Sequence, residues 1–301
     1  MYHGMINVYK EKGYTSHDVV AKLRGICKQK KIGHTGTLDP DAVGVLPVCL
    51  GCATRLCDML TEKDKEYIAV LRLGIATDTQ DITGKVLEEK EVDVPVEEVR
   101  EAIASFQGEQ LQIPPMYSAL KVNGKKLYEL AREGREIERK ARPVTIHKIE
   151  ILEENMPEVT IRVNCSKGTY IRTLCHDIGQ KLYCGGTMVT LKRTRVGNFG
   201  IEGAYTLSRI EDMAKEGKLS EILLPVEKVF EKLPEITVKE EAMKALLNGN
   251  QLKEEEILNL SEETAKAEEV RVYGADGRFY GVYGYQEGRK LFCPIKMFFP
   301  E

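Results

Sequence analysis

Segments with the residue patterns of strands and of helices follow one another along this chain without a regular order. Strand patterns fall at 67–74, 144–152 and 159–165, and helical spacing of apolar residues falls at 16–31, 94–106 and 169–182. A doubly wound parallel fold would show regular β-α alternation, so the sequence predicts an α+β fold with a mixed, largely antiparallel sheet. Ser16 is predicted to cap the first helix, with Asp18 in its first turn.

Residues 33–47 contain three glycines and two prolines. Glycine permits backbone conformations closed to other residues, and proline fixes φ and disfavours helix before it. The segment is therefore predicted to be an ordered surface loop, with Asp39 in its middle pointing outward. A loop aspartate beside a proline is by itself usually a turn-forming residue, so its chemistry depends on the surrounding pattern.

The composition bounds the class of protein. With 301 residues, 42% hydrophobic and 30% charged, the chain is long enough for one large domain and a small one. No stretch approaches the roughly 18 apolar residues that a membrane span needs, and residues 1–5 lack the pattern of a signal peptide. These features predict a cytoplasmic protein.

The eight cysteines are scattered through apolar surroundings and are predicted to be reduced thiols that pack in the core. A zinc site is the alternative, because Cys49 and Cys52 form a C-x-x-C pair with Cys57 close behind. No second pair follows at the spacing of a zinc ribbon or finger, so the pattern favours the core thiols.

The formal net charge of −3 is unevenly distributed. Residues 234–301 hold 13 acidic and 9 basic side chains, whereas Lys121–Lys148 hold nine basic and four acidic ones. The local positive excess suits contact with nucleic-acid phosphates, and a solvated helix face is the alternative explanation.

The run Gly33-His34-Thr35-Gly36-Thr37-Leu38-Asp39-Pro40 resembles the G-H-T-G-x-L-D-P signature of TruB-type tRNA pseudouridine synthases. The similarity extends along residues 5–230, and it includes 67–74, 113–127 and 167–172. The family's Lys-Pro-x-Gly near the N-terminus reads Lys10-Glu11-Lys12-Gly13 here, so the lysine matches and the proline does not.

The resemblance implies a catalytic domain of pseudouridine-synthase type at 1–230, with a basic, RNA-gripping insertion at about 113–148. Residues 234–301 resemble a PUA domain, a small RNA-binding β-barrel. Because this tail is acidic, phosphate binding there would depend on local patches such as Arg271, Arg278 and Arg289.

The resemblance also implies the residues of the site. Asp39 would be the catalytic residue, and Arg172 would be its ion-pair partner, which lowers the pKa of the carboxyl group and keeps it ionised. Tyr67, which sequence patterns alone would assign to a core, would stack on the target base. The residues implied to bind the substrate are Lys10, His34, Tyr67, Tyr170, Arg172 and Leu191. The basic residues expected to face phosphate are Lys192, Arg193 and Arg195.

The implied reaction converts a uridine in the T loop of tRNA, at tRNA position 55, to pseudouridine by base flipping. It needs no cofactor and no metal, and no dinucleotide or P-loop fingerprint is present. The implied partner is the T arm of tRNA, bound by a monomer without guide RNA, DNA or membrane.

Three alternatives stay open. Asp39-Pro40-Asp41-Ala42-Val43 also fits the D-x-D-x-[TV] pattern of magnesium-dependent, haloacid-dehalogenase-type phosphatases, although that motif needs a buried strand before it. The protein could instead assist tRNA folding without chemistry, or as well as it. A guide-RNA-dependent relative is the third, but such relatives lack the basic insertion.

Overall fold

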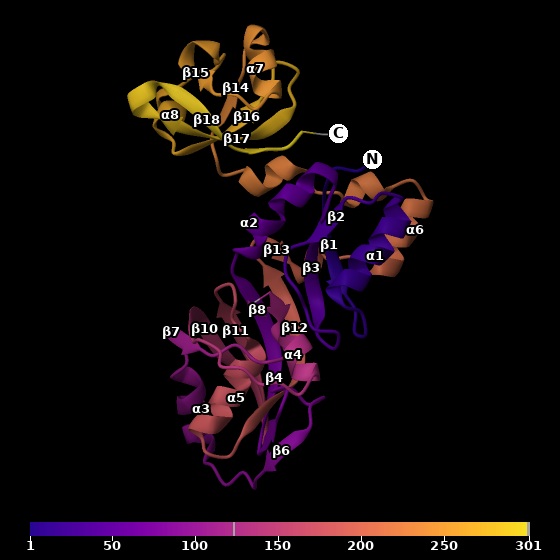
Figure 1. The fold of residues 1–301 in the computed structure, drawn as a ribbon, viewed down its shortest axis with the longest axis vertical. Coiled ribbons are helices and arrows are strands. Elements are labelled where there is room, and N and C mark those ends of the chain that lie inside the picture. Colours follow the sequence, from indigo (N-terminus) through magenta and orange to yellow (C-terminus); the bar gives the residue numbers. More distant parts are fainter. Residues whose placement is uncertain (123, 300–301) are drawn as a thin grey trace.

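The computed structural model describes residues 1–122 and 124–299. Asn123, inside the predicted insertion, and residues 300–301, at the end of the predicted PUA domain, lie outside the described residues. A long sheet runs through the lower two thirds of Figure 1, and a separate five-stranded sheet forms the top.

The long sheet has nine strands, seven of them in a continuous path. Their order is β1 (Gly4–Lys10), β3 (Val43–Leu50), β12 (Gly186–Val196), β4 (Lys65–Leu73), β11 (Glu158–Cys165), β10 (Arg142–Asn155) and β7 (Gly108–Gln112). The other two, β2 (Ile32–His34) and β13 (Phe199–Gly200), pair with β3 and β12. Only the short contact of β12 with β3 is parallel. The predicted α+β fold with a mixed, largely antiparallel sheet is therefore confirmed.

Helices cover the two halves of this sheet separately. On one half, α1 (Ser16–Cys27) and α6 (Leu207–Lys215) bury an apolar core against β1 and β3. On the other half, α3 (Val96–Ala104) and α5 (Ile171–Lys181) bury a second core against β4, β10 and β11. Three short elements complete this part, namely α2 (Cys57–Thr61), β5 (Ile75–Thr77) and β6 (Val86–Glu89).

The first helix is capped by Thr15 and not by Ser16. The Thr15 hydroxyl accepts a hydrogen bond from the Asp18 amide, and the Asp18 carboxylate accepts one from the Thr15 amide. Ser16 is buried, and its hydroxyl accepts a hydrogen bond of 2.9 Å from the amide of Leu38. The predicted cap was wrong because two neighbouring hydroxyls offer the same local pattern. The second hydroxyl instead ties α1 to the loop that carries Asp39.

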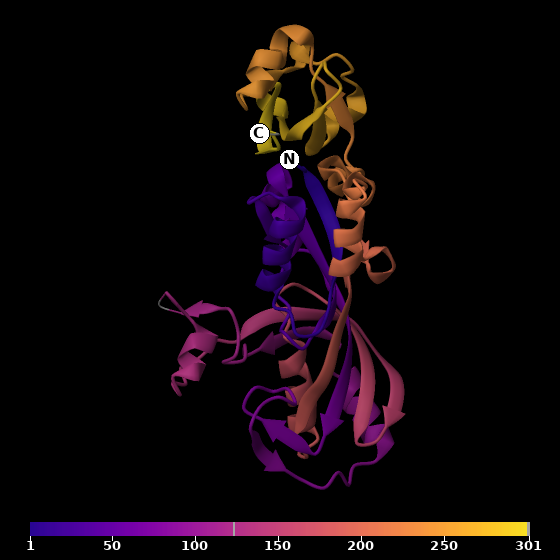
Figure 2. The ribbon, with the colours of Figure 1, turned by 90° about the vertical axis from the view of Figure 1, so that its right-hand side faces the viewer.

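The predicted insertion leaves the sheet after β7 and projects sideways from the body in Figure 2. It holds a two-stranded hairpin, β8 (Lys121–Val122) and β9 (Lys125–Lys126), and the helix α4 (Leu127–Arg132). Its own small core is formed by Met116, Leu127 and Leu130. The chain rejoins the sheet at Arg142, earlier than the predicted residue 148, because Arg142–Asn155 is one long strand.

The C-terminal sheet has the strand order β14-β16-β17-β18-β15 and a core separate from those of the long sheet. Its elements are β14 (Glu235–Thr237), α7 (Met243–Leu247), β15 (Leu252–Lys253), α8 (Glu262–Lys266), β16 (Glu269–Tyr273), β17 (Phe279–Gln286) and β18 (Leu291–Met297). Val282 and Phe298 reach from this sheet into an apolar cluster with Leu56 and Phe230. Arg55 also donates a hydrogen bond of 2.8 Å to the carbonyl of Met297, so the two parts are in direct contact.

Within residues 1–122 and 124–299, no helix is both long enough and apolar enough to cross a membrane.

Candidate active site

Asp39 lies in the segment between β2 and β3, and neighbouring elements hold the backbone of this segment. The buried amine of Lys10 donates a hydrogen bond of 3.0 Å to the Pro40 carbonyl, and the Gly13 amide donates to the same oxygen at 2.9 Å. The Leu38 amide is held by Ser16, as described above. The backbone on both sides of Asp39 is thus fixed, which orients its carboxylate.

Arg193, on β12, supports the same segment from inside the protein. Its side chain donates to the carbonyl of Val45 at 2.7 Å, and it reaches those of Gly36 and Thr37 at 3.3 and 3.5 Å. Gly44 has φ +111°, and a Cβ there would stand 2.1 Å from the Arg193 carbonyl, so only glycine allows this approach. Arg193 is 1% exposed, and the expectation that it faces phosphate is therefore wrong.

The predicted partner of Asp39 is in contact with it. The Arg172 Nε lies 3.1 Å from the Asp39 Oδ2, although the two residues are far apart in sequence. Arg172 also lies 3.4 Å from the Asp81 carboxylate, and it donates to the carbonyls of Thr79 at 3.2 Å and Tyr117 at 2.8 Å. This side chain, 7% exposed, therefore joins three segments of the chain at one point.

The pKa of Asp39 is raised above its ordinary value. Burial of the carboxyl group is the largest cause, and the nearby Asp81 carboxylate adds to it, whereas Arg172 acts in the opposite direction. The attraction of Arg172 was predicted correctly, but the net direction was not, because desolvation outweighs it. Asp39 is still 42% exposed at its side chain, so a substrate can reach the carboxylate.

The side chains that form the wall beside Asp39 come from β4, β12 and the start of α5. Tyr67 is 9% exposed and shares a core cluster with Leu38 and Ala42 of the Asp39 loop, against which Leu191 packs. Burial raises the pKa of Tyr67 and of Tyr170, and the Asp39 charge acts on both hydroxyl groups. The predicted residues Tyr67 and Tyr170 thus lie close enough to feel the Asp39 charge, and Leu191 packs against the same core cluster as the Asp39 loop.

His34 and Lys10 contact the backbone of the Asp39 segment and not the Asp39 carboxylate. The His34 ring stands edge-on to His17 at 5.4 Å, and its Nδ1 accepts a hydrogen bond from the Gly36 amide. Lys10 is fully buried, and its amine also donates to the carbonyls of Glu11 and Tyr14. Burial lowers the pKa of His34 to about 4 and that of Lys10 to about 8.

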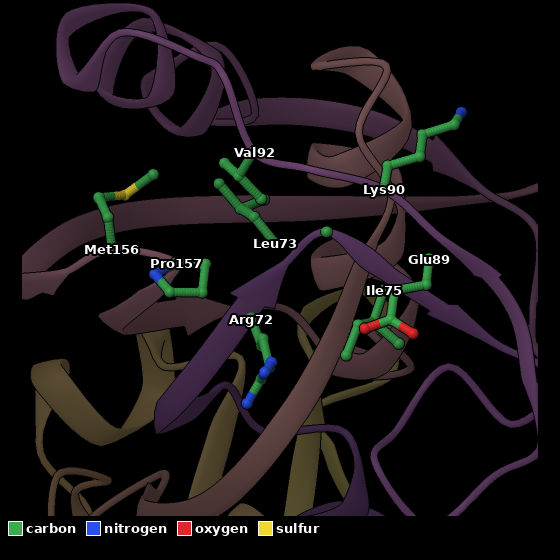
Figure 3. A pocket seen from close by; sticks show the side chains of 9 residues that line it. Arg72, Leu73, Ile75, Glu89, Lys90, Val92, Met156 and Pro157 are labelled. Carbon is green, nitrogen blue, oxygen red and sulfur yellow. The ribbon is translucent and has the colours of Figure 1, made fainter.

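A cavity of about 320 Å³ lies elsewhere, near the far end of β4 (Figure 3). Arg72 and Leu73 line it from β4, and Lys90 and Met156 line it from neighbouring segments. Arg72 is five residues from Tyr67 along the strand, which corresponds to about 16 Å. None of the predicted site residues lines this cavity.

The eight cysteines are free thiols, six of them buried. In the described part of the chain, no group of three or more His, Cys, Asp and Glu side chains is arranged to hold a metal ion.

Comparison with known proteins gives consistent matches along the chain. Residues 24–171 match the N-terminal domain of the TruB family pseudouridylate synthases, and residues 172–231 match the C-terminal domain of tRNA pseudouridylate synthase B. The tRNA pseudouridine synthase B of Lachnoclostridium phytofermentans is 54% identical over 98% of this chain and 99% of its own length. The same enzyme of Bacillus pumilus is 43% identical over 94% of this chain and 93% of its own length. The chain belongs to the TruB family of pseudouridylate synthases.

Two solved structures extend this TruB-family match to the fold. One is an H/ACA ribonucleoprotein bound to a substrate RNA containing 2′-deoxyuridine, with a TM-score of 0.72 and 28% identity over 99% of this chain and 86% of that one. The other is a Cbf5-Nop10-Gar1 complex, with a TM-score of 0.73 and 30% identity over 99% of this chain and 85% of that one. The pseudouridine-synthase fold predicted from the sequence is confirmed.

This TruB-family chain has one site residue that sequence reasoning missed. Asp81 lies in a turn-rich segment, and the hydroxyl of Thr83 donates to its Oδ1 at 2.6 Å while Arg172 approaches its Oδ2. Aspartates in such turns commonly bond their own loop, and nothing local distinguishes one that also meets a distant arginine. Asp81 could have been predicted as a site residue only if the segment that faces Arg172 had been known.

Proposed function

We propose that this chain isomerises the uridine at position 55 in the T loop of tRNA, with Asp39 as the essential catalytic residue. As a member of the TruB family it is a tRNA pseudouridine synthase, an isomerase. One observation supports the proposed tRNA site and the role of Asp39. The Asp39–Arg172 pair, 3.1 Å apart, lies near Tyr67 and Tyr170, next to the segment where the basic insertion begins.

The reaction breaks the bond between uracil N1 and the ribose C1′ and forms a bond between C5 and C1′. The proton on C5 is released, and N1 gains one, so no redox agent or group donor takes part. The carboxylate of Asp39 can reach these atoms only if the uridine leaves its stack, which costs a few kcal/mol. The flat ring of Tyr67 and the apolar Leu191 would offset that cost and keep the detached uracil in place.

The insertion supplies the grip on RNA in this proposal. In the insertion, the cations of Lys126 and Arg132 each lie 5.3 Å from the centre of the Tyr128 ring. Cations and an aromatic ring in this arrangement suit phosphates and an unstacked base. Lys192, which is exposed on β12, would contact phosphate beside the site. The C-terminal sheet would act as the PUA domain.

Lys10 and His34 would take different roles from Asp39. Lys10 is fully buried, so it would affect the substrate only indirectly. Its hydrogen bond to the Pro40 carbonyl would hold the Asp39 loop in place. His34 lies at the edge of the loop, where a neutral ring can pack against the displaced nucleotide. Tyr170 would border the base pocket together with Arg172.

A guide-RNA-dependent reaction is the second candidate, because the similar solved structures include an H/ACA ribonucleoprotein. The basic insertion between β7 and β10 and the close relatives named tRNA pseudouridine synthase B support the stand-alone reading.

The test is to incubate the purified protein, without guide RNA or cofactor, with unmodified tRNA tritiated at uracil C5. Tritium release by the wild type supports the proposed reaction, and Asp39→Asn should abolish it. We expect the variant to lose at least about 10⁴-fold in single-turnover rate. Its tRNA affinity should stay within about threefold, because Asp39 contributes little to phosphate binding. Tight binding without release by the wild type would contradict the proposal.

A further inference from the structure

Hydrogen bonds of Gln112 and of Tyr117 join the insertion and the strand before it to the start of α5. Gln112 is the last residue of β7, directly before the insertion. Its Nε2 donates to the Tyr170 carbonyl at 3.0 Å, and its Oε1 accepts from the Tyr170 amide at 2.7 Å. The carbonyl of Tyr117, inside the insertion, accepts a bond of 2.8 Å from Arg172.

The Gln112 side chain is 5% exposed, so water cannot replace these hydrogen bonds. Both polar ends of its amide are used, and both partners belong to the backbone of one residue. Such a closed pair resembles the two hydrogen bonds that paired residues of antiparallel strands exchange, and it fixes the position of Tyr170 relative to β7. Without Gln112 the Tyr170 amide would lose this partner, which is costly for a donor held away from water, so the arrangement tolerates little displacement. The Tyr170 carbonyl would keep its hydrogen bond of 3.0 Å from the Leu174 amide.

Tyr170 is the N-cap residue of α5, and among the described residues no side chain caps this helix end. Arg172 follows two residues later, in the first turn. A displacement at Tyr170 therefore moves the guanidinium, which must keep its contacts of 3.1 Å with Asp39 and 3.4 Å with Asp81.

We infer that Gln112 is a positioning residue for the isomerisation, which holds Arg172 against Asp39 through the backbone of Tyr170 and so couples the RNA-gripping insertion to the carboxylate. The inference rests on the proposed role of Asp39. Both hydrogen bonds of the Gln112 side chain go to the backbone of Tyr170. Within the described residues, Gln112 forms no hydrogen bond with Asp39 or Tyr67, so it would act on the site only through Tyr170.

The chain contains a matched control in Gln110, two residues earlier on the same strand. Its Nε2 donates only to the carbonyl of Phe106, at 3.3 Å, within the adjoining turn. Gln110→Leu makes the same chemical change as Gln112→Leu without touching α5.

The first test needs no RNA. The pKa of Asp39 is measured in the free protein by NMR of ¹³C-labelled aspartate, with Asp39→Asn used to assign the signal. If Gln112→Leu displaces Arg172, the pKa of Asp39 should rise by about 1 or more, because a cation that lowered it has moved away. Gln110→Leu should leave it as in the wild type. An unchanged pKa of Asp39 in a folded Gln112→Leu protein would overturn the inference.

The second test is the single-turnover rate of tritium release. We expect Gln112→Leu to slow it about 10- to 100-fold, since a small misplacement of a catalytic group has effects of this size. Affinity for tRNA should change less than about threefold, because no phosphate contact is removed. A loss of affinity equal to the loss of rate would assign Gln112 to binding and overturn the inference.

Gln112→Glu covers the case in which the leucine variant does not fold. A protonated carboxyl group can both accept from the Tyr170 amide and donate to its carbonyl, whereas a carboxylate can only accept. The rate of this variant relative to wild type should therefore fall as the pH rises, and a constant ratio would count against the inference. Absence of tritium release by the wild type would refute the proposed function, while the pKa comparison would still test the coupling.

Discussion

The Asp39 loop and the insertion are both irregular in backbone, but they are held in opposite ways. Buried cations bond the carbonyls of the loop, with Lys10 on Pro40 and Arg193 on Gly36 and Thr37. The insertion instead packs mainly on three buried apolar side chains, and most of its cations are exposed, although Arg139 donates to the Pro114 carbonyl at 3.3 Å. Polar contacts fix direction, whereas a small apolar core permits adjustment. Under the proposed function, this difference would give chemical precision to the loop and adaptation to RNA to the insertion.

The largest effect below that of Asp39 is expected at Arg172, where the loop and the insertion meet. Arg172→Gln should reduce the single-turnover rate by about 10² to 10³, as loss of a preorganised charge contact does. It should also lower the free energy of unfolding by about 3 kcal/mol, because Asp81 loses its buried partner. The pKa of Asp39 should rise further, so the acid limb of the pH–rate profile should move to higher pH.

Arg162→Gln is the control for this variant, since Arg162 pairs with Glu150 at 3.6 Å with its side chain 41% exposed. Equal losses of rate in Arg172→Gln and Arg162→Gln would show that the rate depends on the overall positive charge of the protein and not on the contact of Arg172 with Asp39.

A second variant tests how much the buried Arg193 side chain stabilises the Asp39 loop. Arg193→Met should lower the free energy of unfolding by about 1–3 kcal/mol, because the carbonyls of Gly36, Thr37 and Val45 lose their donor. Urea denaturation measures this loss. Arg195→Met, two residues along the same strand but half-buried, should have much less effect. Equal stability of the two variants would mean that the loop holds its shape without the buried cation.

In the insertion, loss of two positive charges should affect binding and leave stability almost unchanged. Lys125→Gln combined with Arg132→Gln should raise KM for tRNA about tenfold, and it should flatten the dependence of affinity on salt. The melting temperature should stay within about 2 °C. Lys266→Gln in α8, an exposed lysine paired with Glu262, is the control. A comparable loss of tRNA affinity in that control would contradict the proposal that the insertion binds tRNA.

Much of this contrast follows from the sequence. The glycines and prolines of 33–47 predicted a surface loop, which is correct around Asp39 but wrong from Val43 on, because Val43–Leu50 is the buried strand β3. The motif correctly brought Asp39 together with Arg172 and Tyr67 from distant segments. The error over Arg193 could have been avoided, because successive side chains of a strand point to opposite faces. Lys192 and Arg193 could not both have faced phosphate.

Other features depended on contacts that no local pattern reveals. The choice of Thr15 over Ser16 as the cap follows from the approach of Leu38, 22 residues away. The bond of Gln112 to Tyr170 spans 58 residues. The raised pKa of Asp39 depends on how much of the folded chain surrounds it, so the sequence could supply its partner but not the extent of its burial.

The smallest predicted effect again separates the two regions, because His34 ends β2 beside the Asp39 loop and residues 113–141 of the insertion contain no histidine. Burial lowers the pKa of His34 to about 4, whereas an unfolded chain binds this proton near the ordinary value of 6.5. Between these pH values the unfolded state holds more protons than the folded one, so stability falls as the pH drops through this range. His34→Gln should remove a part of this fall, on the order of 1 kcal/mol between pH 6.5 and 5. Urea denaturation at several pH values measures the difference, and parallel curves for variant and wild type would show that His34 is not held neutral by the loop.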